Sequence, residues 1–161
     1  MKKILALMLV AICLFALVGC SNEQKDDKIS VFTFYGENEY ISVTNGTAVL
    51  GGDEEVFSGG MLKVLNEDAF ADVVYWSSEF YIAKDVEQKI ISKSVVEDLS
   101  DTASVNISGD LGKISGPDII TVYGGEDTED FINNLFMKFI VRNAQGEEKT
   151  YELHMQVEQV C

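Results

Sequence analysis

The sequence predicts an all-β protein, an antiparallel β-sandwich of about eight to ten short strands with at most one or two helical turns. β-branched and aromatic residues are gathered in short runs, and turn-forming residues separate these runs at intervals of about ten residues. The single proline, Pro117, and the lack of an interior linker favour one domain over residues 29–161. Immunoglobulin-like topology is one form of such a sandwich, although no disulfide–tryptophan core pattern is present, and a small closed barrel is the alternative.

The clearest strand pair is the last one. Leu135–Arg142 and Tyr151–Val157 flank the polar loop NAQGEEK. In the second run Tyr151, Leu153, Met155 and Val157 alternate with Glu152, His154, Gln156 and Glu158. A period of two residues is typical of a half-buried antiparallel strand.

The segment Tyr40–Leu50 contains Asn45-Gly46 between two alternating runs. Asn-Gly supplies the positive φ angles of a type I′ turn, so a hairpin is expected here. In that hairpin Ile41, Val43 and Val49 would share a buried face.

Other runs complete the expected elements. Further strands are expected at Ile29–Tyr35, Met61–Leu65, Val73–Ala83, Gln88–Val96, Ser104–Ser108 and Ile119–Tyr123. Asn66 is expected to cap one helical turn that continues to Ala71, and a short helix is expected to begin at Thr128.

The N-terminus has the pattern of an export signal. Lys2 and Lys3 precede the wholly apolar segment Ile4–Val18. This segment is shorter than the ~20 residues that cross a bilayer as a helix, and the small residue Gly19 before Cys20 suits cleavage.

Leu17-Val18-Gly19-Cys20 resembles the lipobox of bacterial lipoproteins. The resemblance implies a signal peptide over residues 1–19, cleavage between Gly19 and Cys20, and a diacylglyceryl group on the Cys20 thiol. The mature protein would then lie on the extracytoplasmic face of the cell membrane, with residues 20–28 as lipidated cysteine and flexible polar tether. An uncleaved N-terminal anchor is the alternative.

A second resemblance lies in the residues that follow. Phe32–Glu39, followed by Asn45-Gly46, is similar to the start of small β-rich lipoproteins of Gram-positive bacteria whose function is uncharacterised. This resemblance implies a β-rich envelope lipoprotein and brings no active site with it.

The charge excludes one class of partner. Without residues 1–19 the chain has ten basic and 27 acidic residues, a net charge of −17. Such a surface repels nucleic acid. Of the three cysteines, Cys161 alone is left for other chemistry once Cys13 is removed and Cys20 is lipidated, so no intramolecular disulfide is available.

The sequence contains no catalytic motif. His154, the only histidine, lies on the polar face of its strand, so a solvated imidazole is expected. One histidine cannot build a multi-histidine zinc site, and neither a Gly-x-Ser-x-Gly elbow nor a phosphate-binding glycine loop is present. We therefore expect a protein that is not an enzyme.

Two features remain as candidate binding sites. Acidic loops offer oxygen ligands for calcium, or are simply solvated, and no other cofactor is expected. Their residues are Asp53, Glu54, Glu55, Asp127, Glu129 and Asp130. The strand Val73–Ala83 carries Tyr75, Trp76, Phe80 and Tyr81, which would form an aromatic binding face if exposed and part of the core if covered.

Together these patterns predict a lipid-anchored, non-catalytic binding module of the bacterial cell envelope. Its partner would be an envelope protein, an extracellular protein or peptide, or a glycan. A hydrolase or an accessory subunit acting on an envelope substrate, and a structural spacer, are the alternatives.

Overall fold

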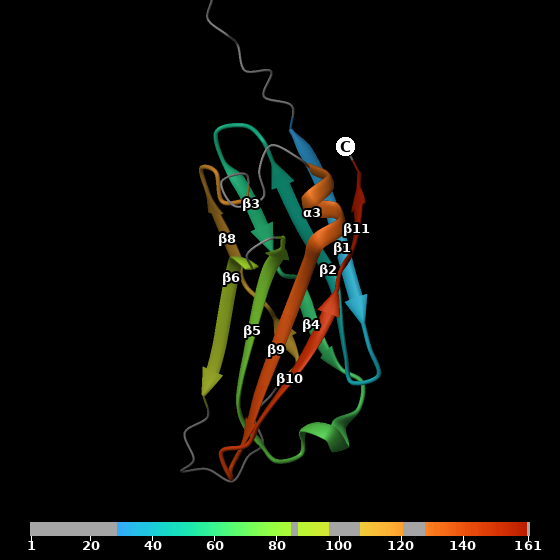
Figure 1. Cartoon of the computed structure of the whole chain (residues 1–161), viewed down its shortest axis with the longest axis vertical. Helices are drawn as coiled ribbons and strands as arrows, with labels where there is room; N and C mark the ends of the chain where they lie inside the picture. Colours follow the sequence, from blue (N-terminus) through green and yellow to red (C-terminus); the bar gives the residue numbers. More distant parts are fainter. Residues whose placement is uncertain (1–28, 85–86, 97–106, 121–127, 161) are drawn as a thin grey trace, which may run out of the picture.

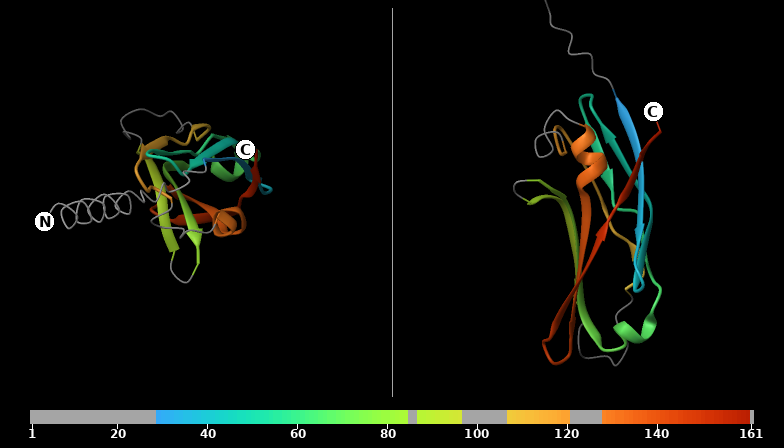
Figure 2. Two further views of the ribbon diagram at one scale, coloured as in Figure 1. Left: turned by 90° about the horizontal axis from the view of Figure 1, so that it is seen from above. Right: turned by 45° about the vertical axis from the view of Figure 1, so that its right-hand side comes forward.

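The computed structural model describes residues 29–84, 87–96, 107–120 and 128–160, which form two antiparallel sheets packed face to face (Figures 1 and 2). Sheet A contains β1 (Ser30–Glu37), β2 (Ile41–Leu50), β3 (Glu55–Ser58), β4 (Met61–Val64), β7 (Gly109–Asp110), β8 (Lys113–Gly116) and β11 (Gln156–Gln159). Sheet B contains β5 (Val73–Ala83), β6 (Glu87–Val96), β9 (Leu135–Asn143) and β10 (Glu148–His154). The predicted antiparallel β-sandwich is confirmed.

The strand order of each sheet refines that prediction. Sheet A has the order β11-β1-β2-β3-β8, with β4 also paired to β2 and β7 to β4, and sheet B has the order β10-β9-β5-β6. β3 stays beside β2 in sheet A, whereas the strand that follows the second immunoglobulin strand belongs to the opposite sheet. The two separate sheets also differ from the single closed barrel.

The predicted C-terminal strand pair is the β9–β10 hairpin. Tyr151 lies opposite Phe139, and Leu153 lies opposite Met137. All four of these side chains are buried, while Glu152 and the other polar residues of β10 face solvent. The alternation in the sequence therefore marks the core face correctly.

Met155 is the point at which the chain changes sheets. β10 ends at His154 in sheet B, and β11 pairs with β1 in sheet A, where Val157 lies opposite Phe34. The Met155 N–H donates a 2.9 Å hydrogen bond to Leu135 O, and its side chain is buried between the sheets. The last strands thus connect the two layers at one edge, which Figure 2 shows in its right-hand view.

The prediction of a hairpin at Asn45-Gly46 is wrong. Ile41–Leu50 is one strand, β2, with a β-bulge at Asn45, whose φ is 59°. The pairing with β1 shifts between Phe34 opposite Gly46 and Gly36 opposite Val43, so β2 has one extra residue. A bulge reverses the alternation: Ile41 and Val43 are buried before it, but Ala48 and Leu50 are buried after it, and Val49 is only half-buried.

The core between the sheets is largely aromatic. Phe34 and Phe57 from sheet A stack with centroids 5.2 Å apart, and Phe80 from sheet B meets both edge-on at 5.7 and 5.2 Å. These three side chains are almost fully buried. Edge-to-face rings fill the space efficiently and stabilise the interface beyond the area that they bury.

Short helices lie at the two ends of the sandwich. α3 (Thr128–Asn134) lies at the upper end in Figure 1, and the 3₁₀ turn η1 (Glu67–Phe70) lies at the lower end. Both expected helical segments are confirmed. Within the described residues the Asn66 side chain makes no capping hydrogen bond, so η1 is held instead by burial of Phe70.

The remaining predictions have mixed outcomes. The strands expected at Met61–Leu65, Val73–Ala83 and Gln88–Val96 correspond to β4, β5 and β6. Ile119 and Ile120 lie in a turn rather than a strand, and Ile107 and Ser108 precede β7. Residues 104–106 and 121–123 lie outside the described residues, as do Gly19, Cys20, the rest of residues 1–28, and Cys161.

Candidate functional site

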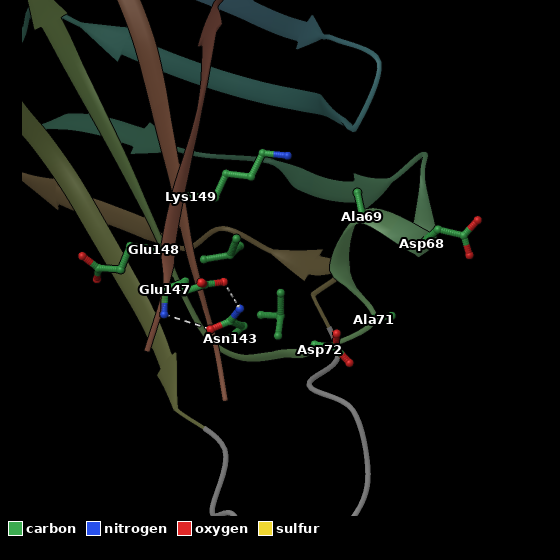
Figure 3. Close-up of a pocket in the computed structure, with 10 residues that line it drawn as sticks. Asp68, Ala69, Ala71, Asp72, Asn143, Glu147, Glu148 and Lys149 are labelled. Atoms are coloured by element: carbon green, nitrogen blue, oxygen red, sulfur yellow. Dashed lines mark hydrogen bonds between the residues drawn. The ribbon is translucent and has the colours of Figure 1, made fainter. Parts of the chain in front are cut away.

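A hollow of about 480 Å³ opens at the lower end of the sandwich, between η1 and the β9–β10 turn (Figure 3). We call it the lower hollow. Its lining residues are Asp68, Ala69, Ala71, Asp72, Val73, Val141, Asn143, Glu147, Glu148 and Lys149. They come from two segments far apart in the sequence, which the pairing of Val73 with Asn143 brings together.

The apolar part of the hollow is rigidly supported. Val73 and Val141 belong to adjacent strands of sheet B, and both side chains are buried. Phe70 anchors η1 beside them by packing on Tyr151 at 5.2 Å and on Phe139 at 6.1 Å between ring centroids. The hollow therefore has a floor built from the core itself rather than from a loose loop.

Asn143 shapes the turn that forms one wall. Its Oδ1 accepts hydrogen bonds from the backbone N–H groups of Gln145 (3.1 Å) and Glu147 (2.9 Å). Its Nδ2 donates to Glu147 Oε2 at 2.9 Å, so Asn143 and Glu147 face one another in Figure 3. Gly146 supplies the positive φ of 84° that this turn needs. The local sequence thus fixes the position of the Glu147 carboxylate.

The rim of the lower hollow is acidic. Arg142 Nη2 forms an ion pair of 2.7 Å with Glu148, which is thereby neutralised. Among the described residues no lysine or arginine forms an ion pair with Asp68, Asp72 or Glu147. These three exposed carboxylates give the mouth an excess of negative charge above an apolar floor.

Lys149 is the one cationic residue in the lining, and its ammonium lies on aromatic rings. Nζ is 4.8 Å from the centroid of Tyr40 and 4.8 Å from that of Tyr151. Proximity to the Tyr151 hydroxyl raises the pKa of Lys149, and the nearby Tyr40 and Glu39 add to this effect. The ammonium is therefore kept charged while it lies against the rings.

Of the two alternatives for the aromatic residues of β5, the structure favours the covered one over an exposed binding face. Trp76 and Phe80 point between the sheets and are 3% and 1% exposed. Tyr81 is on the outer face of sheet B, but it is buried beneath Phe136 and hydrogen-bonded to Glu152. Tyr75 is half-buried with Arg142 4.9 Å from its ring centroid. Tyr75 is thus the only one of the four side chains that is not buried, and β5 presents no exposed aromatic face.

The predicted calcium loops do not form one site. Glu55 is buried, and its carboxylate accepts hydrogen bonds from Ile120 N at 2.7 Å and Gly51 N at 3.3 Å, while Asp53 and Glu54 are exposed beside it. Glu129 and Asp130 lie in the first turn of α3, where Asp130 pairs with Lys84. Asp127 lies outside the described residues. No group of three or more potential metal ligands occurs within the parts of the chain that are described.

His154 has a defined place that the sequence did not indicate. Its imidazole stacks on Phe136 with centroids 4.5 Å apart, and Nε2 lies 2.8 Å from Asn133 O at the end of α3. The side chain is exposed, as expected from its position on the polar face of β10.

The sequence held only a weak signal for the lower hollow. NEDAFAD and NAQGEEK are two acidic, turn-forming segments, but nothing local indicates that they meet.

No helix within the described ranges is both long and apolar enough to cross a membrane. No protein-family model matches the chain, and comparisons with curated proteins and with solved structures found no match either.

Proposed function

We propose that this protein is a lipid-anchored binding module of the bacterial cell envelope, and that the lower hollow binds a lysine- or arginine-rich segment of an extracytoplasmic protein or peptide. The observation that carries the proposal is the combination of an apolar floor built from the core with three carboxylates, Asp68, Asp72 and Glu147, that form no ion pair with any described lysine or arginine. Carboxylates attract cations, and the apolar floor accepts the methylene stems of lysine or arginine side chains.

The small free energy of one exposed ion pair favours a partner with several charges. One exposed ion pair contributes only about 0.2–1 kcal/mol, so a single cation would bind too weakly to matter. Three such pairs contribute about 0.6–3 kcal/mol together, and contact of the methylene stems with the apolar floor adds to this, so a partner with several charges is needed for measurable binding. The net charge of −17 in the chain without residues 1–19 would also speed the approach of a basic partner.

The placement of the hollow supports the same proposal. The N-terminal end of β1 and the C-terminal end of β11 lie at the upper end in Figure 1, whereas η1 and the β9–β10 turn lie at the lower end. An anchor attached ahead of residue 29 would therefore leave the hollow at the end farther from the membrane. That is the end at which a soluble or wall-associated partner can approach.

Calorimetric titration of the full-length protein in detergent with a tetralysine peptide tests this proposal, with tetraserine as the uncharged comparison. The Asp72→Asn/Glu147→Gln variant should weaken tetralysine binding about 3- to 30-fold, because two ion pairs are lost. The matched control is Asp53→Asn/Glu54→Gln, which makes the same charge change in the exposed β2–β3 loop at the other end. Equal affinity of the two variants would refute the lower hollow as the site.

A variant that leaves the net charge unchanged tests whether the position of the Glu147 carboxylate matters, and not only its charge. Asn143→Ala removes the three hydrogen bonds that hold the turn and the Glu147 carboxylate, so tetralysine binding should weaken by about two- to fivefold. Gln145→Ala in the same turn keeps the backbone N–H that Asn143 binds and should bind as the wild type does. Binding that is unchanged by Asn143→Ala would argue for diffuse electrostatic attraction instead.

A further inference from the structure

The Lys149 ammonium occupies a cation site made by the protein itself. The centroids of Tyr40 and Tyr151 are 4.8 Å apart with the rings tilted by 55°, and Lys149 Nζ is equally distant from both. We call these two rings the tyrosine pair. Ring faces attract cations, and ligand ammonium groups are bound by aromatic side chains arranged in this way.

The resident ammonium is held loosely. Among the described carboxylates none forms an ion pair with Lys149, although Asp68 and Asp72 line the same hollow. The side chain is exposed, and Figure 3 shows it extended along one edge of the hollow, away from Glu147 and Asp72. A long, flexible lysine that is held at an exposed site by two ring faces and a nearby tyrosine hydroxyl, without an ion pair to a described carboxylate, is easily exchanged for another cation.

The two rings of the tyrosine pair are held in place by the core, whereas the Lys149 side chain is not. Tyr151 is 5% exposed and packs on Phe70 and Phe139, and Tyr40 is half-buried against the same core. The rings would therefore remain in place if the lysine left. A preformed site with a mobile internal occupant has the properties of a competitively blocked binding site.

We propose that the tyrosine pair is the subsite for an ammonium group of the bound ligand, and that Lys149 blocks this subsite until the ligand displaces it. This inference rests on the proposed function, since the ligand reaches the rings from the lower hollow. The ligand class is an organic cation, the ammonium of a lysine side chain. Its methylene stem would cross the floor while other charges meet Asp72 and Glu147.

Nuclear magnetic resonance of the wild-type full-length protein tests displacement directly. Because Lys149 Nζ lies 4.8 Å from both ring centroids, the ring currents should shift the signals of the adjacent Cε protons upfield in the free protein. Saturation with tetralysine should return them toward the values of an exposed lysine. If tetralysine binds but the Lys149 signals keep their shift, the ligand does not replace Lys149 and the inference is overturned.

Substitution provides the second test. Lys149→Gln should bind tetralysine about three- to tenfold more tightly than the wild type at both low and high salt, because an internal competitor is removed. Lys63→Gln is the matched control, since Lys63 is an exposed lysine of β4, the strand that precedes η1, and its loss makes the same charge change without touching the tyrosine pair or the Arg142–Glu148 ion pair. Equal gains in both variants, lost together at high salt, would show a purely electrostatic effect and contradict the inference.

Tyr40 variants complete the test. In the Lys149→Gln background, Tyr40→Phe keeps a ring face and should retain the gain, whereas Tyr40→Leu should abolish it. Circular dichroism checks that each variant is folded. If wild-type protein does not bind tetralysine at all, the proposed function fails as well. If it binds in a manner that depends on Asp72 and Glu147 but not on Tyr40 or Lys149, only this inference fails.

Discussion

The Tyr81 hydroxyl donates a 2.8 Å hydrogen bond to Glu152 Oε2 and so joins β5 to β10 across the intervening strand β9. Phe136 of β9 stacks on the Tyr81 ring, and Lys138 Nζ lies 4.5 Å from the centroid of that ring. Three strands of sheet B are thereby connected on their outer face. Burial, reinforced by the bond to Glu152, strongly raises the pKa of Tyr81.

The raised pKa of Tyr81 predicts a loss of stability in alkali. Below about pH 10 the hydroxyl is protonated in both the folded and the unfolded chain, and its bond to Glu152 contributes fully. Above that pH the unfolded chain loses the proton first, so the free energy of unfolding falls as pH rises. Tyr81→Phe should cost about 1–2 kcal/mol near neutral pH, and this cost should shrink toward pH 11.

Urea denaturation near pH 8 and near pH 11 measures that difference. Tyr35→Phe is the control, because the Tyr35 side chain is 44% exposed. It should change the free energy of unfolding by less than about 0.5 kcal/mol. A Tyr81→Phe cost that is the same at both pH values would contradict the link between this hydroxyl and alkaline stability.

The bulge at Asn45 leaves no room for a side chain at the next residue, Gly46. A Cβ atom on Gly46 would lie 2.1 Å from the Phe34 ring, so Gly46→Ala should lower the free energy of unfolding by about 3 kcal/mol. Gly116→Ala is the control, since its Cβ would make only ordinary contact with Ile119 at 3.6 Å. Similar thermal stability of the two variants would argue for the hairpin that the sequence alone indicates.

We predict that Glu55, the buried acidic residue at the start of β3, stabilises the fold. Its buried carboxylate accepts backbone hydrogen bonds from Ile120 and Gly51 and so fastens the segment after β8 to β3. Glu55→Gln should cost about 1–3 kcal/mol, because charge-assisted bonds to a buried group are weakened. The neighbouring exposed Glu54→Gln should be nearly neutral in the same urea denaturation. Equal small effects would instead mean that Glu55 is solvated.

The sequence predicted the fold class because side-chain alternation is a local property. Tyr151, Leu153 and Met155 are buried as their spacing indicates, even though the chain changes sheets at Met155. Asn45 was misassigned because a hairpin turn and a bulge both require its positive φ. The partner strands decide between them. β3 and β4 both pair with β2 and are separated at Gly60, which lies so close to the bulge that a Cβ atom there would be 2.2 Å from the Thr44 carbonyl oxygen.

The candidate site was not predictable in the same way. Asp72 and Lys149 line one hollow only because β5 and β9 pair in the register that sets Val73 against Asn143. The short strands β3, β7 and β8 were also missed, whereas β4, which is as short as β3 and β8, was predicted; segments of two to four residues have few positions to show a period. Long-range register, rather than composition, creates both the hollow and the edges of sheet A.

The lipobox resemblance predicts the chemistry of the N-terminus. Intact-mass spectrometry of protein extracted from bacterial membranes should show loss of residues 1–19 and a diacylglyceryl group on Cys20. Two acyl chains suffice for stable anchoring, at about 0.8 kcal/mol for each buried CH₂ group, so the protein should partition into detergent. Cys20→Ser should abolish both the modification and the partitioning, whereas Cys161→Ser should leave them unchanged. Retention of residues 1–19 together with an unmodified Cys20 would show that the N-terminal segment is an uncleaved anchor.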